Sequence, residues 1–352
     1  MTSLYRTYRP KTFAELTGQE TIVRTLHGAL SSGRIGHAYL FCGPRGTGKT
    51  TMARLFAKAI NCETRKSNNE QRITSNEPCN QCHSCTQINE GRSLDLVEVD
   101  AASNTGVDNV RELIESSRVA APSGGYKVFL IDEVHMLSKS AFNALLKTLE
   151  EPPKHVVFIL ATTEPHKVPE TIISRVQRFD FRKIAREELL TKLRKIAKNE
   201  KLTIDDGSLE LVVAGSGGSF RDAESLLSKI MAFSGDTITE KQTSSLLGII
   251  PERTHEKFLA SLLEKKSSSA LEMISDLHES GANMEQFCIQ FIAYARKKMV
   301  DGLNDRAKSN DPSFDPHRYV TLIEAFMLAR NDLKTSPIPQ LPLELAVIEL
   351  TK

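Results

Sequence analysis

Residues 43–50 read GPRGTGKT and fit the pattern G-x-x-x-x-G-K-[ST]. The loop follows the short apolar run Ala38–Cys42 and precedes a helical pattern at 51–60, which is the context in which the motif is meaningful. Glycines let backbone N–H groups turn inward around phosphate groups, and the positive end of the following helix points to the same place. The loop therefore predicts phosphate binding; the alternative is an ordinary glycine-rich turn.

Two side chains of this loop have specific predicted contacts. Lys49 should reach the β- and γ-phosphates of ATP, and the Thr50 hydroxyl should coordinate Mg²⁺. The predicted nucleotide-binding residues of the loop are Gly43, Pro44, Arg45, Gly46, Thr47, Gly48, Lys49, Thr50 and Thr51.

Two acids end another apolar run. Residues 127–131 read KVFLI, and Asp132 and Glu133 follow them. At a strand end, Asp132 would hold Mg²⁺ directly or through water, and Glu133 would polarise the attacking water as general base. Such an acid pair is not rare by itself, but together with the phosphate loop it predicts a hydrolytic site. An adjacent glutamate suits hydrolysis by water rather than phosphoryl transfer to a small acceptor.

Three further polar residues are candidates for sensing the γ-phosphate. Thr163 follows an apolar run and could hydrogen-bond the phosphate or the water, although it could also be an ordinary strand-ending threonine. Arg175 could neutralise transition-state charge on a neighbouring subunit's nucleotide, and its position favours it over the nearby Arg178. Arg221 begins a helical stretch and could reach back to the γ-phosphate, although an arginine at such a place is more often solvated.

A cysteine cluster follows the phosphate-loop helix. Cys79, Cys82 and Cys85 form C-x₂-C-x₂-C, and Cys62 lies 17 residues before Cys79. Four thiolates suit a tetrahedral, closed Zn²⁺ site with a structural role. An iron–sulfur site, no metal at all, and His83 as a competing ligand remain as alternatives.

Apolar runs and helical patterns alternate in the first half of the chain. The predicted strands are 38–42, 94–99, 127–131, 156–160 and a weaker one at 177–182. Their apolar, largely β-branched or aromatic character is typical of strands covered on both faces. The alternation predicts a five-stranded parallel sheet between layers of helices, and the pattern after residue 183 predicts helices only. Polar loops are expected at 63–77 and 301–316.

Composition is that of an ordinary globular protein. The chain has 352 residues, 46 basic against 44 acidic side chains and a net charge of +2, so contact with DNA would need a local patch or an assembly. No run is long enough to span a membrane and the N-terminus does not resemble a secretory signal. These features predict a cytoplasmic protein with reduced cysteines, among which Cys42 and Cys288 are expected in the core.

Longer stretches resemble one known family. They are residues 8–10, 13 and 18–19, His37 to Phe41, the phosphate loop, 100–103 (DAAS), 130–153 (LIDEVHMLSKSAFNALLKTLEEPP), 161–165 and 218–223. The chain resembles the gamma/tau subunits of bacterial DNA polymerase III, strongly over 1–250 and weakly beyond. Val176 stands where this family often has cysteine, and the segment between Cys62 and Cys79 is longer than usual.

The resemblance implies an architecture and several residue roles. It implies an AAA+ core at 1–182 with an inserted zinc module at about 62–85, a helical lid at 183–242 and a helical, oligomerising collar at 243–352. Tyr8 and Arg9 would lie near the adenine, and Arg175 would act in trans. The chain's end soon after the collar suggests a gamma-like form or a piece of a longer chain.

The resemblance also implies an activity and partners. ATP binding and hydrolysis would drive opening of the sliding clamp beta and its loading onto primer–template DNA. Expected partners are delta, delta prime and further gamma/tau copies in a five-subunit ring, and the polymerase core; no membrane is expected. As part of the polymerase III holoenzyme, the chain would be grouped with DNA-directed DNA polymerases, which are nucleotidyltransferases.

Other functions compete with this one. Another AAA+ machine, such as a helicase or initiator, would be expected to carry a pore loop or a DNA-binding domain, and neither is recognisable. A nucleotide-gated scaffold without turnover is disfavoured by Lys49, Asp132 and Glu133. A small-molecule P-loop kinase is disfavoured by Glu133 and by the helical second region.

Overall fold

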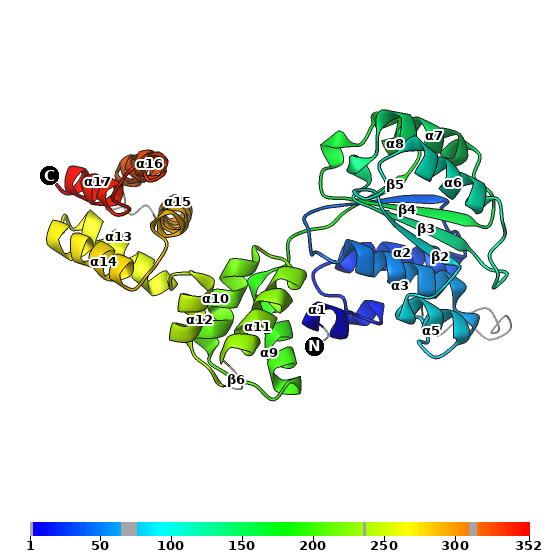
Figure 1. Cartoon of the computed structure of the whole chain (residues 1–352), viewed down its shortest axis with the longest axis horizontal. Helices are drawn as coiled ribbons and strands as arrows, with labels where there is room; N and C mark the ends of the chain where they lie inside the picture. Colours follow the sequence, from blue (N-terminus) through cyan, green and yellow to red (C-terminus); the bar gives the residue numbers. More distant parts are fainter. Residues whose placement is uncertain (1–2, 65–75, 235–236, 310–314) are drawn as a thin grey trace. The chain divides into compact units, whose positions relative to one another are not determined.

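A five-stranded parallel sheet forms the centre of the first half of the chain (Figure 1). The computed structural model describes residues 3–64, 76–234, 237–309 and 315–352. The strand order is β2-β3-β4-β1-β5. The strands are β1 (Ala38–Cys42), β2 (Leu96–Asp100), β3 (Lys127–Asp132), β4 (Val156–Thr162) and β5 (Gln177–Asp180). The predicted five-stranded parallel sheet is therefore confirmed.

The central strands are buried on both faces. Every residue of β1 and β4 is buried, which explains why these strands read as continuous apolar runs rather than as an alternating pattern. Successive residues face opposite layers: Tyr39 and Phe41 pack in one core, and Leu40 packs in the other. The sheet thus separates two hydrophobic cores, one on each face.

Helices cover both faces of this sheet (Figure 1). One core includes residues of α2 (Glu20–Ser32) and α3 (Lys49–Asn61). The other includes residues of α6 (Val107–Ser117), α7 (Lys139–Glu150) and α8 (Glu170–Ile173). Other short elements in this half are α1 (Leu4–Thr7), η1 (Phe13–Glu15), α5 (His83–Glu90), η2 (Val134–Met136) and η3 (Pro165–Lys167).

The strand order brings the predicted site residues to one edge of the sheet. Because parallel strands end at the same edge, the segments after β1, β3 and β4 lie together there. β4, which Thr163 directly follows, lies between β1 and β3. The phosphate loop, the acid pair and this threonine therefore follow three adjacent strands.

The rest of the chain is mainly helical. The helices are α9 (Arg186–Asn199), α10 (Asp206–Ser216), α11 (Phe220–Ser234), α12 (Glu240–Leu247), α13 (Glu252–Leu263), α14 (Ser267–Glu279), α15 (Met284–Ser309), α16 (Pro316–Asp332) and α17 (Leu341–Thr351). Residues of α13 to α17 share one hydrophobic core that contains Phe258, Phe287, Phe291 and Phe326. Among the described residues, none of the helices combines the length and apolar character that crossing a bilayer requires.

Two expectations for this region were wrong. β6 (Thr203–Ile204) pairs in parallel with β7 (Thr237–Ile238), although helices alone were expected after residue 183. Two-residue strands are too short to show a period of two, so they leave no pattern in the sequence. The loop expected at 301–316 is helical up to Ser309, because α15 continues there as a polar helix; residues 310–314 and most of the loop expected at 63–77 lie outside the described residues.

The chain folds as two compact units. The first consists of Met1–Ile196 and Ser216–Ser225, and the second of Ala197–Gly215 and Leu226–Lys352. The first unit therefore holds the sheet together with the beginning of α11, which carries Arg221. The expected domain boundaries at residues 182 and 242 remain predictions.

Candidate nucleotide-binding site

The loop after β1 requires glycine at several positions. Gly43, Gly46 and Gly48 have φ angles of 146°, 72° and 101°, a region that side chains disfavour. A Cβ on Gly43 would lie 2.5 Å from the Phe181 carbonyl oxygen, so the backbone is also closely packed there. α3 then begins at Lys49 without a side-chain cap on its first turn. Its first N–H groups are therefore oriented to receive an anion at the loop.

Lys49 lies inside this loop. Its ammonium group donates hydrogen bonds to the carbonyl oxygens of Gly43 (2.7 Å) and Pro44 (2.9 Å), and the residue is only 6% exposed. Burial lowers the pKa of Lys49, while the carboxylates of Glu133 and Asp132 act in the opposite direction. The ammonium group is thus placed where phosphate oxygens would be held.

The two predicted magnesium ligands contact each other. The Thr50 hydroxyl donates a hydrogen bond of 2.8 Å to Oδ2 of Asp132, joining the start of α3 to the end of β3. A hydroxyl and a carboxylate beside a phosphate loop are the oxygen donors that Mg²⁺ prefers. The residues present therefore fit a bound magnesium ion.

Glu133 and Thr163 are brought together from neighbouring strands. The Thr163 hydroxyl and backbone N–H donate to Oε2 of Glu133 at 2.9 Å and 3.2 Å. Glu133 itself has φ 47° and ψ 46°, a left-handed conformation that is unusual outside glycine and is often found at functional sites. The carboxylate is thus held in a fixed place next to Asp132.

His135 is a residue of this site that the sequence did not indicate. Its side chain is 6% exposed, its Nδ1 lies 3.0 Å from the Thr162 hydroxyl and 3.5 Å from Oε2 of Glu133, and its Nε2 lies 3.3 Å from Oε1 of Glu164. The histidine therefore connects Glu133 to the segment after β4. Its position two residues after Glu133 carries no recognised pattern, so only the folded structure shows the contact.

A cavity of about 620 Å³ opens beside the loop. The sequence-predicted residues that line it are Arg9, Arg45, Gly46, Thr47, Gly48, Lys49, Thr50, Thr51, Asp132, Glu133 and Arg221. Tyr5 and Arg6 also line it without having been predicted, whereas Tyr8, Gly43, Pro44, Thr163 and Arg175 are not among the lining residues. The cavity thus joins the loop to the N-terminal segment (residues 8–19), to Tyr5 and Arg6 before it, and to the start of α11.

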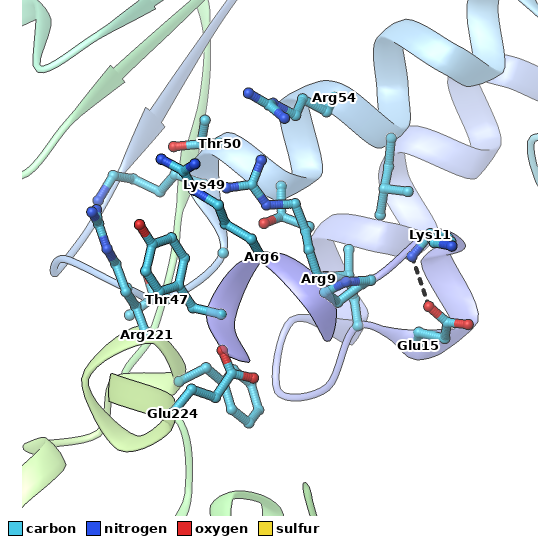
Figure 2. A pocket seen from close by; sticks show the side chains of 18 of the residues that line it. Arg6, Arg9, Lys11, Glu15, Thr47, Lys49, Thr50, Arg54, Arg221 and Glu224 are labelled. Atoms are coloured by element: carbon cyan, nitrogen blue, oxygen red, sulfur yellow. Dashed lines mark hydrogen bonds between the residues drawn. The ribbon is translucent and has the colours of Figure 1, made fainter. Parts of the chain in front are cut away.

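The cavity is strongly basic on the side of the N-terminal segment. Figure 2 shows Arg6, Arg9 and Arg54 extending toward the region of Lys49 and Thr50, with Arg221 reaching in from α11. The Arg221 guanidinium lies 5.1 Å from the centre of the Tyr5 ring. Burial, followed by the charge of Arg54, lowers the pKa of Arg9. Such an arrangement suits a ligand with several negative charges.

Arg175 lies at the end of the sheet where the strands begin, opposite the end that carries the phosphate loop. Its carbonyl oxygen is 3.2 Å from Nε2 of His37, just before β1, whereas the phosphate loop follows the other end of β1. Its guanidinium group forms an ion pair of 2.6 Å with Glu150. Arg175 is therefore separated from the loop of its own chain by the length of the strand, about 16 Å.

The four cysteines of the predicted metal site meet in the fold. The sulfur atoms of Cys62, Cys79, Cys82 and Cys85 all lie within 4.8 Å of one another. The backbone N–H groups of Cys82 and Gln81 donate to the sulfur of Cys79 at 3.3 Å and 3.5 Å. Burial raises the pKa of the Cys79 thiol, but hydrogen bonds from the Thr64 side chain and from these two backbone groups outweigh it and lower the pKa to about 6. Four converging sulfur donors with such support fit a tetrahedral Zn²⁺ site.

The sheet order, the glycine loop after β1 and the acids after β3 together give the arrangement of a P-loop fold of the AAA+ class. One solved structure with a similar fold is the Thermotoga maritima RuvB Holliday junction branch migration motor, with a TM-score of 0.50 and 20% sequence identity over 73% of this chain and 80% of that one. At this identity the likeness concerns the fold.

Sequence relatives identify the family of this chain more narrowly than the fold likeness does. Subunit tau of DNA polymerase III from Bacillus subtilis (strain 168) is 40% identical over 99% of this chain and 63% of that protein. The Escherichia coli (strain K12) tau subunit is 39% identical over 88% of this chain and 47% of its own length. The gamma subunit of Buchnera aphidicola subsp. Acyrthosiphon pisum is 40% identical over 83% of this chain and 78% of that protein.

The chain belongs to the family of DNA polymerase III gamma/tau subunits, as the resemblance in its sequence predicts. A family model described as "DNA polymerase III, delta subunit" also matches residues 18–185. The chain spans 63% of the length of the Bacillus subtilis tau subunit and 47% of the length of the Escherichia coli one.

Proposed function

We propose that this chain is an ATP-hydrolysing subunit of a bacterial clamp loader, which uses ATP to open a sliding clamp and place it on primed DNA. One observation supports this most directly. Lys49, Thr50, Asp132 and Glu133 line a single cavity, and Glu133 is held by Thr163. The family, whose members are DNA polymerase III subunits, supplies the biological setting.

The phosphates of ATP would bind in the loop after β1. The backbone N–H groups of the loop and of the first turn of α3 would donate to phosphate oxygens, and the Lys49 ammonium would exchange its contacts with the Gly43 and Pro44 carbonyls for the β- and γ-phosphates. Thr50 and Asp132 would hold Mg²⁺, which neutralises phosphate charge when bound. Arg9 would lie on the nucleotide side of the N-terminal segment.

Hydrolysis requires a base next to the γ-phosphate. Glu133 would accept a proton from water as the water oxygen bonds to the γ-phosphorus and the bond to the β–γ bridging oxygen breaks, leaving ADP and phosphate. The contacts of Glu133 with Thr163 and His135 fix where its carboxylate lies. Arg221 lines the same cavity and would add positive charge near the γ-phosphate.

Arg175 would act on the nucleotide of a neighbouring subunit. Its place at the opposite edge of the sheet keeps it from the loop of its own chain, while its 34% exposed side chain can be presented to another copy or a companion subunit. A guanidinium group supplied in this way stabilises transition-state charge. The ATP site would then be complete only in an assembly.

The resemblance to the family supports proposed roles for the remaining domains. The helices at 183–242 would form the lid domain. Those at 243–352 would form a collar in a five-subunit ring with delta, delta prime and further gamma/tau copies, and the cysteines would form a structural zinc module. The ring would act on the clamp beta and on primer–template DNA, in contact with the polymerase core, in the cytoplasm. Nucleotidyl transfer is not proposed for this chain, because its cavity carries the residues for ATP hydrolysis and the names of its relatives assign no polymerase activity to this subunit.

The decisive experiment is an ATPase measurement in stages. The rate is measured for the chain alone, then with companion subunits, then with the clamp and primed DNA added. We expect stepwise stimulation and clamp loading onto DNA. Saturable ATP binding with no hydrolysis at any stage would instead favour a nucleotide-gated scaffold.

A further inference from the structure

The N-terminal segment (residues 8–19) lines the nucleotide cavity but has little structure of its own. Arg9, Pro10, Lys11, Glu15, Leu16 and Thr17 all contribute to the lining. The only regular structure within the segment is the three-residue helix η1, and Phe13 anchors it by full burial against the ring of His27 at 4.9 Å. The position of the segment must therefore depend on what holds it from outside.

The turn that carries the first two cysteines of the C-x₂-C-x₂-C motif holds this segment directly. The Glu77 carboxylate accepts hydrogen bonds from the backbone N–H groups of Phe13 (2.6 Å) and Ala14 (3.0 Å), so it satisfies the start of η1. Asn80 donates from its side-chain amide to the Lys11 carbonyl oxygen at 3.0 Å. Asn80 lies between Cys79 and Cys82 with φ 58°, a conformation fixed by the turn.

Lys58 lies on α3, the helix after the phosphate loop, and connects this helix to the N-terminal segment and to the 77–80 turn. Its ammonium group donates to the Lys11 carbonyl (2.9 Å), to Asn80 Oδ1 (2.7 Å) and to Asn89 Oδ1 (2.9 Å), which uses all three of its protons. The residue is 2% exposed, on the last turns of α3, and Cys62 caps the end of that helix. A buried ammonium group with three fixed acceptors is a strongly directional link.

We propose that the four-cysteine module positions the N-terminal segment against the nucleotide, so that metal binding and ATP binding are positively coupled. A metal held by Cys62, Cys79, Cys82 and Cys85 would join the end of α3, the 77–80 turn and α5. Residues 9–17 would then be held in place by the hydrogen bonds of Glu77, Asn80 and Lys58. The inference rests on the proposed function, since it concerns the same ATP site.

Glu77 provides the cleanest test because it touches the segment and is not among the cavity-lining residues. Glu63 is a matched control: its carboxylate also accepts a backbone hydrogen bond, but from Ser84 within the cysteine module, at 3.1 Å. In zinc-loaded protein we expect Glu77→Ala to weaken AMP-PNP binding with Mg²⁺ on the order of 10-fold, and Glu63→Ala to change it less than about 2-fold. A Co²⁺-substituted sample of each variant reports by its absorption spectrum whether four thiolates still bind.

Linkage supplies a second readout that does not depend on activity. If AMP-PNP binds more tightly to the zinc form, zinc must bind more tightly in the presence of AMP-PNP by the same factor. Zinc affinity is measured by competition with a chromogenic chelator, with and without AMP-PNP and Mg²⁺. We expect a gain on the order of 10-fold for the unaltered chain and for Glu63→Ala, and a gain below about 2-fold for Glu77→Ala.

The outcomes separate the two proposals. Unchanged AMP-PNP affinity in Glu77→Ala, or zinc affinity indifferent to AMP-PNP, overturns the coupling and leaves the proposed ATPase intact. Failure of the zinc-loaded, unaltered chain to bind AMP-PNP in its assembly overturns the proposed function itself. A purely structural role for Glu77 would lower the melting temperature and leave the AMP-PNP affinity of the folded protein as it was, which also counts against the coupling.

Discussion

Glu133 combines an unusual backbone conformation with a fixed carboxylate. A left-handed φ at a residue with a long side chain costs on the order of 1 kcal/mol or more and persists only where surrounding contacts impose it. Here the contacts with Thr163 and His135 do so. The strain is thus located at the group to which the proposal assigns proton transfer.

Replacing this glutamate by its amide tests the assignment. Glu133→Gln keeps the size and the hydrogen bond from Thr163 but removes the basic carboxylate, so we expect ATP affinity within about 3-fold of the unaltered chain and hydrolysis slower by roughly 10²–10⁴-fold. The measurement is nucleotide affinity and single-turnover hydrolysis in the assembled complex. Glu115→Gln, on the exposed side of α6, serves as the control. An intact rate in Glu133→Gln would remove Glu133 from the role of base.

Arg175 and Arg178 form a natural pair for testing action in trans. Both are surface arginines near β5 and both pair with an acid, Glu150 for the first and Asp180 for the second. We expect Arg175→Ala to leave ATP binding nearly unchanged and to lower assembly-stimulated hydrolysis by about 10³-fold or more, because the transition-state charge loses its guanidinium group. Arg178→Ala should keep most of the rate, and equal losses in the two variants would contradict the distinction between them.

At the scale of elements, the sequence predicted most of what local patterns can encode. The buried runs of β1, β3 and β4, the loop at 43–50 and the cysteine spacing were all recognisable, because each depends on neighbours in the chain. His135, Glu77 and Lys58 were not, since their significance comes from contacts with segments far away in the sequence. The β6–β7 pair was missed because strands of two residues are too short to leave a pattern in the sequence.

α12 begins with a capping box, which permits a local stability test. The Thr239 hydroxyl accepts from the Gln242 backbone N–H, and the Gln242 side chain accepts from the Thr239 backbone N–H. Thr239→Ala should destabilise this helix start by about 1 kcal/mol. Because this raises the population of the open form about 5-fold, the first-turn amides should exchange their hydrogens about 5-fold faster. Ser245→Ala, at an exposed interior position of α12, is the control. Equal exchange rates in the two variants would mean that the cap adds nothing in solution.

At the scale of the whole molecule, the division into two units has a thermodynamic consequence. Each unit has hydrophobic cores of its own: the two sheet-facing cores belong to the first, and the aromatic core of α13 to α17 belongs to the second. Unfolding therefore need not be a single cooperative transition, and conditions can act on one unit alone. A titratable group buried in only one of these cores makes that unit distinguishable.

His255 is such a group. It is 4% exposed in the core of the second unit, with its ring centre 5.5 Å from that of Phe287 and 6.0 Å from that of Tyr294. Burial lowers its pKa from 6.5 to about 4, an effect that the nearby side chain of Gln290 and the charge of Glu252 oppose. Because the folded-state pKa lies below the unfolded one, the unfolded chain takes up a proton first as the pH falls.

The stability associated with a neutral His255 is therefore full above pH 6.5 and is lost as the pH falls from 6.5 toward 4. With about 1.36 kcal/mol for each unit of pKa shift, the total loss is on the order of 3 kcal/mol. Differential scanning calorimetry between pH 4 and 7.5 should show the transition of the second unit moving to lower temperature over this range. His255→Phe should flatten that dependence, whereas His317→Gln, at the exposed start of α16, should leave it unchanged. A pH dependence that survives in His255→Phe would assign the acid sensitivity to other groups.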